Sequence, residues 1–150
     1  MHNFASFLFN KLVSFGVNIK KEWVDECVRC GISSYEEVLQ RFIIEDISQC
    51  CEPHGDFLMF SGRKYSKLDN DVVLQVDEIV DISLKKSKRN KFKYSENPTF
   101  KFVLDDSGFK MIGLMRSAIP GFADGSEGKK IKISAGTEIF YGIFFLNKDN

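Results

Sequence analysis

The chain has 150 residues, of which 43% are hydrophobic and 28% are charged, a balance typical of a globular protein. A chain of this length forms one domain, or two small units that share a core, and buries about 70% of its unfolded surface. Its 21 basic and 21 acidic residues give a formal net charge of zero. This balance argues against a protein that binds a nucleic-acid backbone over its whole surface, because such domains are usually basic. No apolar run approaches the roughly 20 residues that span a bilayer. The N-terminal residues lack the features of a signal peptide, so we expect a soluble intracellular protein.

Three helices are predicted within residues 1–50, with apolar residues recurring every three or four positions. The first covers Phe4–Phe15, and the second runs from about Ile19 to Cys30. The third begins at a capping box, Ser33-x-x-Glu36. Its apolar stripe consists of Tyr35, Val38, Leu39, Phe42, Ile43 and Ile47. Short helices persist only when packed together, so we predict a three-helix unit.

The four cysteines include a Cys27-x-x-Cys30 pair, a spacing found in zinc and redox sites. The second pair, Cys50 and Cys51, is adjacent, and adjacent side chains rarely point at one metal ion. A redox pair would start a helix after a strand, whereas Cys27 falls late in a predicted helix. We therefore predict cysteines packed between helices, with no metal and no cofactor.

Residues 51–71 are predicted to be a connection with a short extended piece at 57–60, and from Val72 the hydrophobic period changes to two. Strands are expected at 72–82, 99–105, 109–115, 131–135 and 137–146. In the first strand, one face carries Val72, Leu74, Val76, Val80 and Ile82, interrupted by Glu78, which we expect to reach solvent.

Gly142 inside the fifth predicted strand indicates a bulge or sharp bend of the kind that barrels need at their corners. Five antiparallel strands, with a wider gap between the third and the fourth, fit a partly open barrel of the OB type. The predicted fold class is therefore α+β. It consists of a three-helix unit, residues 1–50, packed on a five-stranded antiparallel OB-fold barrel, residues 72–150.

A basic segment, residues 84–98, connects the first two predicted strands and is longer than most hairpin loops. Its candidate contact residues are Lys85, Lys86, Lys88, Arg89, Lys91, Phe92, Lys93 and Tyr94. The segment is either a solvated loop or a phosphate contact. The two aromatic residues among the cations favour a contact.

Five strings in the same order resemble the N-terminal half of the RecQ-mediated genome instability protein 1 family, over about Val17 to Lys148. The first two, Glu22–Val28 (EWVDECV) and Phe42–Ile47 (FIIEDI), are similar to the second helix and to the end of the third helix of that family. The others are similar to its barrel strands: Val73–Ser83 (VLQVDEIVDIS), Gly128–Ile131 (GKKI) and Tyr141–Leu146 (YGIFFL).

The resemblance implies a non-enzymatic nuclear subunit of a complex that contains a type IA topoisomerase III and a RecQ-type helicase. In that family the helical unit and barrel bind the topoisomerase. The loop between the first two barrel strands enters the topoisomerase gate and promotes decatenation and dissolution of double Holliday junctions. The shorter basic segment of this chain leaves gate insertion open as a third interpretation of that segment.

Candidate partner-binding residues lie in two places. Ile43 and Ile44 are consecutive, and one helix stripe cannot bury both. We assign Ile43 to the core, whereas Ile44 faces either the barrel or the partner. Asp46 is either a solvated acid or an anchor for a cation across the interface. On the second and third strands, the outward apolar positions are Val103, Ile112 and Leu114, which suit burial against a protein partner or the helical unit.

The main alternative is an OB-fold protein that binds single-stranded DNA. Such proteins stack bases on aromatic residues exposed on the second and third strands. No outward position on those two predicted strands is aromatic, so we expect the isolated protein to bind DNA weakly. We expect no enzyme, because the only histidines are His2 and His54 and no nucleophile elbow or phosphate-binding loop occurs.

Overall fold

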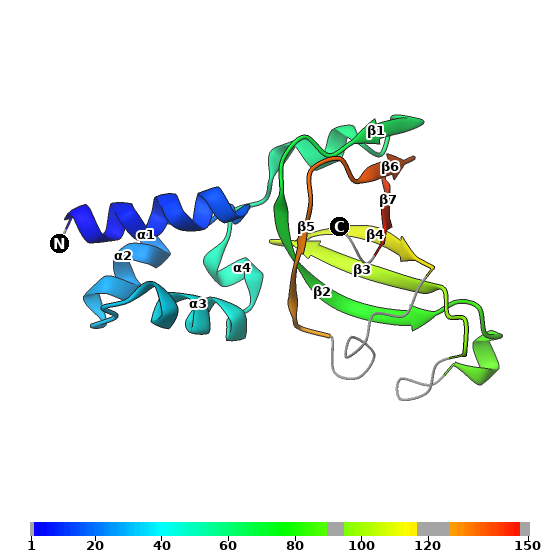
Figure 1. The fold of residues 1–150 in the computed structure, drawn as a ribbon, viewed down its shortest axis with the longest axis horizontal. Coiled ribbons are helices and arrows are strands. Elements are labelled where there is room, and N and C mark those ends of the chain that lie inside the picture. Colours follow the sequence, from blue (N-terminus) through cyan, green and yellow to red (C-terminus); the bar gives the residue numbers. More distant parts are fainter. Residues whose placement is uncertain (1, 90–94, 117–126, 148–150) are drawn as a thin grey trace.

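The structure is a computed structural model that describes residues 2–89, 95–116 and 127–147. Helices lie at one end of the molecule and a curled β-sheet at the other (Figure 1). The α-helices are α1 (His2–Phe15), α2 (Lys21–Arg29), α3 (Tyr35–Ile44) and α4 (Ile47–Cys50). The strands are β1 (Tyr65–Lys67), β2 (Val72–Asp81), β3 (Phe100–Asp106), β4 (Phe109–Met115), β5 (Lys130–Ile133), β6 (Glu138–Phe140) and β7 (Ile143–Leu146). None of the helices in these ranges is long and apolar enough to cross a membrane.

The helical unit contains a fourth helix, where the sequence predicted three. The third predicted helix ends at Ile44, because Glu45 adopts an extended conformation with ψ at 148°. Asp46 then caps α4 by accepting a hydrogen bond from the Ser48 amide. The capping box of α3 also lies one residue later than predicted. Ser34 accepts from the Glu37 amide and Glu37 accepts from the Ser34 amide, and the Glu37 carboxylate also accepts from the Ser33 amide.

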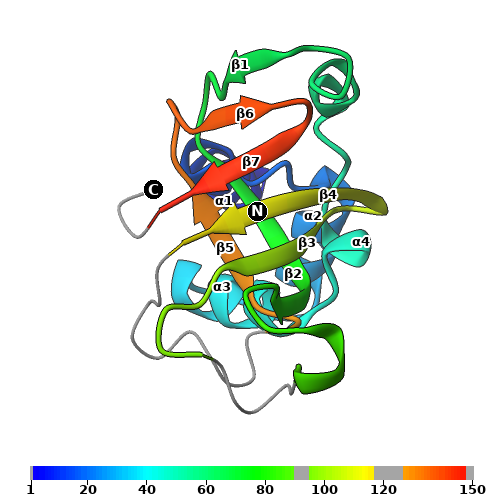
Figure 2. The same ribbon diagram turned by 90° about the vertical axis from the view of Figure 1, so that its right-hand side faces the viewer.

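Within the described residues, the sheet has seven strands in the order β1-β6-β7-β4-β3-β2-β5, where the sequence predicted five antiparallel strands. All pairings are antiparallel except that of β4 with β7, which is parallel. The additional strands have two sources. β1 forms within the predicted connection and pairs with β6, and the long fifth predicted strand divides into β6 and β7. In Figure 2, β1, β6 and β7 lie beside β4 and β3 as one curved layer.

Gly142 forms a tight turn rather than a bulge within a strand. Tyr141 and Gly142 both have positive φ, at 50° and 79°, and Phe140 pairs directly with Ile143. Two consecutive residues with positive φ are typical of a two-residue hairpin turn. The turn reverses the chain and therefore brings both halves of the predicted strand into the sheet side by side.

The inward face of β2 changes at a β-bulge near Asp77. The register with β3 shifts between Val76 and Glu78. Because an extra residue inverts the alternation of side chains, Ile79 is buried where the sequence predicted Val80 and Ile82 to face inward. Glu78 is exposed, as predicted, and Ile82 is exposed as well.

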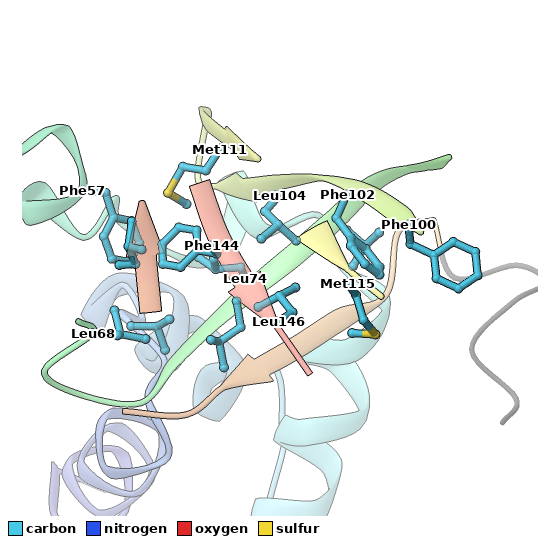
Figure 3. Close-up of a cluster of buried hydrophobic side chains, with 14 of the residues drawn as sticks. Phe57, Leu68, Leu74, Phe100, Phe102, Leu104, Met111, Met115, Phe144 and Leu146 are labelled. Carbon is cyan, nitrogen blue, oxygen red and sulfur yellow. The ribbon is translucent and has the colours of Figure 1, made fainter. Parts of the chain in front are cut away.

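Two hydrophobic cores hold the molecule together. The helical core includes Leu8, Leu12, Trp23, Val38 and Phe42, together with the buried cysteines 27, 50 and 51. The sheet core includes Phe102, Leu104 and Phe144, which meet Phe57 and Leu68 from the predicted connection (Figure 3). Phe57 lies in a 3-10 helix, Gly55–Met59, rather than in the extended piece that was predicted.

The two cores meet at the start of β2. The Val73 side chain belongs to the helical core, and the Val73 amide donates to the carbonyl of Gly16, directly after α1. The Gln75 side chain accepts a hydrogen bond from the Ile47 amide at 2.9 Å. The helical unit therefore packs on the sheet through direct contacts, as the predicted packing requires.

Candidate partner-binding surfaces

Ile43 and Ile44 form an exposed aliphatic pair at the C-terminal end of α3. Ile44 is 82% exposed and Ile43 is 57% exposed. The assignment of Ile43 to the core was wrong. The buried stripe of α3 consists of Val38 and Phe42, and the helix ends before Ile47 could continue a stripe through Ile43. Both isoleucines are therefore available to a partner.

The backbone that carries this pair is held from both sides. The Lys130 ammonium of β5 donates to the carbonyl oxygens of Ile43, at 3.4 Å, and Glu45. The same ammonium lies 4.9 Å from the centre of the Phe42 ring. A cation at this position also interacts favourably with the negative end of the helix dipole. Burial lowers the pKa of Lys130, an effect that the nearby thiols and carboxylates oppose.

Glu45 fixes the other side of the same backbone. Its carboxylate accepts hydrogen bonds from the Arg41 guanidinium, at 2.8 Å, and from the Trp23 indole. Burial raises the pKa of Glu45, and the hydrogen bonds from Arg41 and Trp23 lower it further than burial raises it. The Ile43–Ile44 pair consequently projects from a braced helix end.

Asp46 is exposed, but its carboxylate has internal partners. It accepts hydrogen bonds from the Ser48 hydroxyl, at 2.5 Å, from the Ser48 amide, at 2.9 Å, and from the Gln75 side chain, at 3.2 Å. These hydrogen bonds, those from Ser48 first, lower the pKa of Asp46. Asp46 therefore starts α4 and joins it to β2, in addition to any contact with a partner.

Val103, Ile112 and Leu114 point outward from the sheet and are half-buried. Val103 and Ile112 are paired residues of β3 and β4, and Leu114 pairs with Lys101. None of the three belongs to either hydrophobic core. The predicted apolar outer patch is therefore present on the sheet.

The two predicted partner-binding patches, the Ile43–Ile44 pair and the outer patch of the sheet, do not lie on adjacent elements. The Ile43–Ile44 pair lies beside β5, whereas the outer patch lies on β3 and β4. β2 lies between β3 and β5 in the sheet. A partner that contacts both must reach across the outer side of β2.

Two side chains of β7, Ile143 and Phe145, extend the outer patch, and sequence reasoning missed them. On β7, Ile143 and Phe145 alternate with the buried Phe144 and Leu146 and face outward. Ile112 pairs with Ile143 and Leu114 with Phe145. The alternation within residues 138–146 was visible in the sequence, but the parallel pairing that places β7 beside β4 was not.

The basic segment is tied at its base by a buried carboxylate. Asp81, the last residue of β2, is 2% exposed. It accepts hydrogen bonds from the amides of Ser83, Ser95 and Thr99, at 3.0, 2.8 and 3.3 Å. It also accepts from the hydroxyls of Ser83 and Ser95, at 2.6 and 2.9 Å. We call this set the Asp81 anchor, and it holds the two ends of the segment together.

The Asp81 anchor changes the acidity of its carboxylate. Burial raises the pKa of Asp81, but the hydrogen bonds from Ser83 and Ser95 outweigh burial and lower it to about 2. Beyond the anchor, Lys85, Lys86, Lys88 and Arg89 are exposed. The other candidate contact residues of the segment, Lys91, Phe92, Lys93 and Tyr94, lie outside the described residues.

Most of the remaining chemically reactive side chains are engaged in packing, but Cys30 is exposed, so the prediction that the cysteines pack between helices was wrong for Cys30. Cys27, Cys50 and Cys51 are buried, and burial raises the pKa of the Cys27 thiol to about 11. The His54 ring meets the buried Asp106 carboxylate at 2.7 Å, and the neighbouring Ser107 hydroxyl donates to the carbonyl of Cys51. Among the residues that the structure describes, no cluster of three metal-binding side chains occurs.

Comparison with known proteins adds no assignment to these surfaces. No protein-family model matches the chain, and no curated protein matches it significantly.

Proposed function

We propose that this protein is a non-enzymatic accessory subunit that binds a type IA topoisomerase III within a complex that also contains a RecQ-type helicase. It acts in the nucleus, where it stabilises the topoisomerase and promotes decatenation and the dissolution of double Holliday junctions. The proposal combines the sequence resemblance with the two surfaces described above.

The observation that carries the proposal is the Ile43–Ile44 pair. Two adjacent aliphatic side chains, 57% and 82% exposed on a braced helix end, form a small apolar surface that a partner can cover. Interface hot spots are side chains that enter a well-packed pocket of the partner and lose contact with water there. Ile44 has the exposure and the fixed backbone that such a contact requires.

We also propose that the sheet is an OB-type barrel. β2, β3, β4, β5 and β7 serve as its five principal strands, and β1 and β6 are short additions. The antiparallel succession β2–β3–β4 and the return of β7 beside β4 support this assignment. Such folds host many functions, so the fold by itself does not select the partner.

Calorimetric titration of the Ile44→Asp variant against a type IA topoisomerase III tests the proposal. A buried carboxylate opposite an apolar pocket weakens binding by at least about 2 kcal/mol, as for a hot spot. Val13→Asp is the matched control, because Val13 is an exposed aliphatic residue on α1. Unchanged affinity of the Ile44→Asp variant, or equal weakening by both variants, would contradict the assignment.

A further inference from the structure

Two rows of paired residues cross the outward face of the sheet. The first row runs Glu78, Val103, Ile112, Ile143, Phe140, Tyr65 from β2 to β1. The second row runs Val80, Lys101, Leu114, Phe145, Glu138, Lys67 over the same strands. The apolar outer patch of β3 and β4 thus continues without interruption into β7, β6 and β1.

Three aromatic rings gather at the β7–β6–β1 end of these rows. The Tyr65 and Phe140 rings lie 5.0 Å apart, and the Phe140 and Phe145 rings lie 5.1 Å apart. Tyr65 is 46% exposed and Phe145 is 43% exposed. We call Tyr65, Phe140 and Phe145 the outer aromatic cluster, and none of the three belongs to the sheet core.

Cations border this cluster. Lys101 and Lys67 lie in the second row, on either side of Leu114, Phe145 and Glu138. Arg116 follows β4 directly and is exposed. The basic segment leaves β2 after Asp81, the residue that pairs with Phe100, and Phe100 in turn pairs with Met115. Lys101, Arg116 and the point where the basic segment leaves β2 therefore lie at the same end of the sheet.

We propose that this face is a binding site for single-stranded nucleic acid. Unpaired bases stack on the outer aromatic cluster, and the phosphates lie along Lys101 and Arg116. Aromatic rings on a sheet with cations beside them are the combination that single strands recognise, because every base has a flat face and every phosphate a charge. A protein partner would satisfy the apolar positions but would not need cations at the border.

The acidic residues of the face define where the strand lies. Glu138 accepts a hydrogen bond from the Tyr65 hydroxyl at 3.3 Å and lies between Phe145 and Lys67. A carboxylate repels phosphates, so the backbone passes on the Lys101 side and bases cover the rings. Because the net charge of the chain is zero and few cations contact phosphates, we expect modest affinity with a shallow dependence on salt concentration.

Fluorescence anisotropy with an oligo-dT probe of about 12 nucleotides, within the usual range of such sites, tests the proposal on the full chain at low salt. We expect saturable binding that Phe145→Ala weakens about tenfold, which corresponds to one lost stacking contact. Tyr65→Ala weakens it similarly, whereas Tyr65→Phe retains binding because the ring remains. With two phosphates in contact, the logarithm of affinity falls with the logarithm of salt concentration with a slope of about −1.4.

Phe7→Ala is the matched control, because Phe7 is a phenylalanine on α1 that is 52% exposed and distant in sequence from the sheet. It leaves DNA affinity unchanged. Phe145→Leu keeps most of the apolar volume and packs against Phe140, so it separates loss of stacking from loss of folding. We expect thermal unfolding to show that the Phe145→Leu variant is folded. This variant nevertheless binds the probe several-fold more weakly than the wild-type protein.

Three results would overturn the proposal. They are the absence of saturable binding, Phe145→Ala binding as tightly as wild type, and a duplex of equal length binding as tightly as the single strand. Weakened topoisomerase binding by Phe145→Ala, with DNA affinity unchanged, would assign the cluster to the protein partner instead. Ile44→Asp leaves DNA affinity unchanged, so failure of the topoisomerase proposal and failure of this site give different results.

Discussion

At the scale of single residues, the side chains that distinguish this protein are polar groups fixed by several hydrogen bonds. Asp81 illustrates the cost and benefit of such an arrangement. Its carboxylate is buried, which is unfavourable for a charge, yet five hydrogen bonds compensate it. The result is a fixed base for a long connection, in which the described cations Lys85, Lys86, Lys88 and Arg89 are exposed.

Replacement of Asp81 by Asn is expected to lower the free energy of unfolding by about 2 kcal/mol at neutral pH. An amide cannot accept all of these hydrogen bonds, so buried donors lose their partner. The pKa of Asp81 is lower in the folded state, at about 2, than its ordinary value. Its ionisation therefore stabilises the fold above the ordinary pKa, and this contribution is lost as the pH falls through about 2.

Chemical denaturation of both proteins between pH 6 and pH 2 measures this contribution, since other acids titrate equally in the two. The difference in free energy of unfolding between the wild-type protein and the Asp81→Asn variant is expected to become smaller as the pH falls. Asp77→Asn is the control, because Asp77 is half-buried and pairs with the exposed Lys110. A difference that stays constant with pH would mean that the Asp81 charge does not stabilise the fold.

At the scale of elements, substitutions at the start of α3 can test whether Ser33 or Ser34 is its N-cap. In the structure, Ser34 accepts from the Glu37 amide, and Ser33 precedes the helix. Ser34→Ala is therefore expected to lower the free energy of unfolding by about 1 kcal/mol. Ser33→Ala is expected to change it by less than about 0.5 kcal/mol, as for an ordinary surface site. A larger effect at Ser33, measured by urea unfolding, would restore the capping box that the sequence predicted.

The basic segment is the element whose role we expect to be separable from folding. Replacing residues 85–93 with glycine and serine keeps the Asp81 anchor, so the free energy of unfolding changes by only about 0.5 kcal/mol. Topoisomerase affinity also remains nearly unchanged. The stimulation of decatenation by the protein is expected to fall, because the replacement removes cations that we propose contact the DNA strands passing through the topoisomerase gate.

An acidic replacement of the same segment sharpens this prediction. Repulsion from DNA then adds to the lost attraction, so decatenation falls further than with the neutral segment. The three proteins are compared at equal occupancy of the topoisomerase. Equal stimulation by all three would show that the segment is a solvated connection and that the protein acts only as a binding scaffold.

At the scale of the whole molecule, the two cores depend on a close approach between the end of α1 and the start of β2. Gly16 has φ at 104°, and a side chain there would meet the carbonyl oxygen of Asp71 at 2.7 Å. Gly31, after α2, has a similar φ of 92° but open space around it. Substitution of Gly31 therefore introduces backbone strain alone, whereas substitution of Gly16 introduces backbone strain and a steric clash.

Gly31→Ala is expected to lower the free energy of unfolding by about 1 kcal/mol, the cost of left-handed backbone for alanine. Gly16→Ala carries the same cost and must also displace backbone at the joint, so its effect is expected to be at least twice as large. Thermal and urea unfolding of both variants provide the comparison. Equal effects would indicate that the joint adjusts freely and that the two units are loosely coupled.

Local patterns in the sequence determined α1, α2, the approximate start of α3 and most strands, because these depend on neighbours within a few residues. The apolar spacing placed α1 and α2 within a few residues of their ends, and the alternation of polar and apolar residues located β3 and β4. The same local reasoning identified Ile44 as a residue that its own helix cannot bury. The exposed Glu78 followed from the cost of burying a charge.

Only the tertiary structure decided how these elements combine. The bulge at Asp77 inverted the faces of β2, and the turn at Tyr141–Gly142 split one predicted strand into two. The parallel pairing of β4 with β7 then gathered Tyr65, Phe140 and Phe145 beside Leu114 and Ile112. Residues this far apart in the chain meet only through long-range pairing, whose register depends on the whole sheet and leaves no local pattern in the sequence.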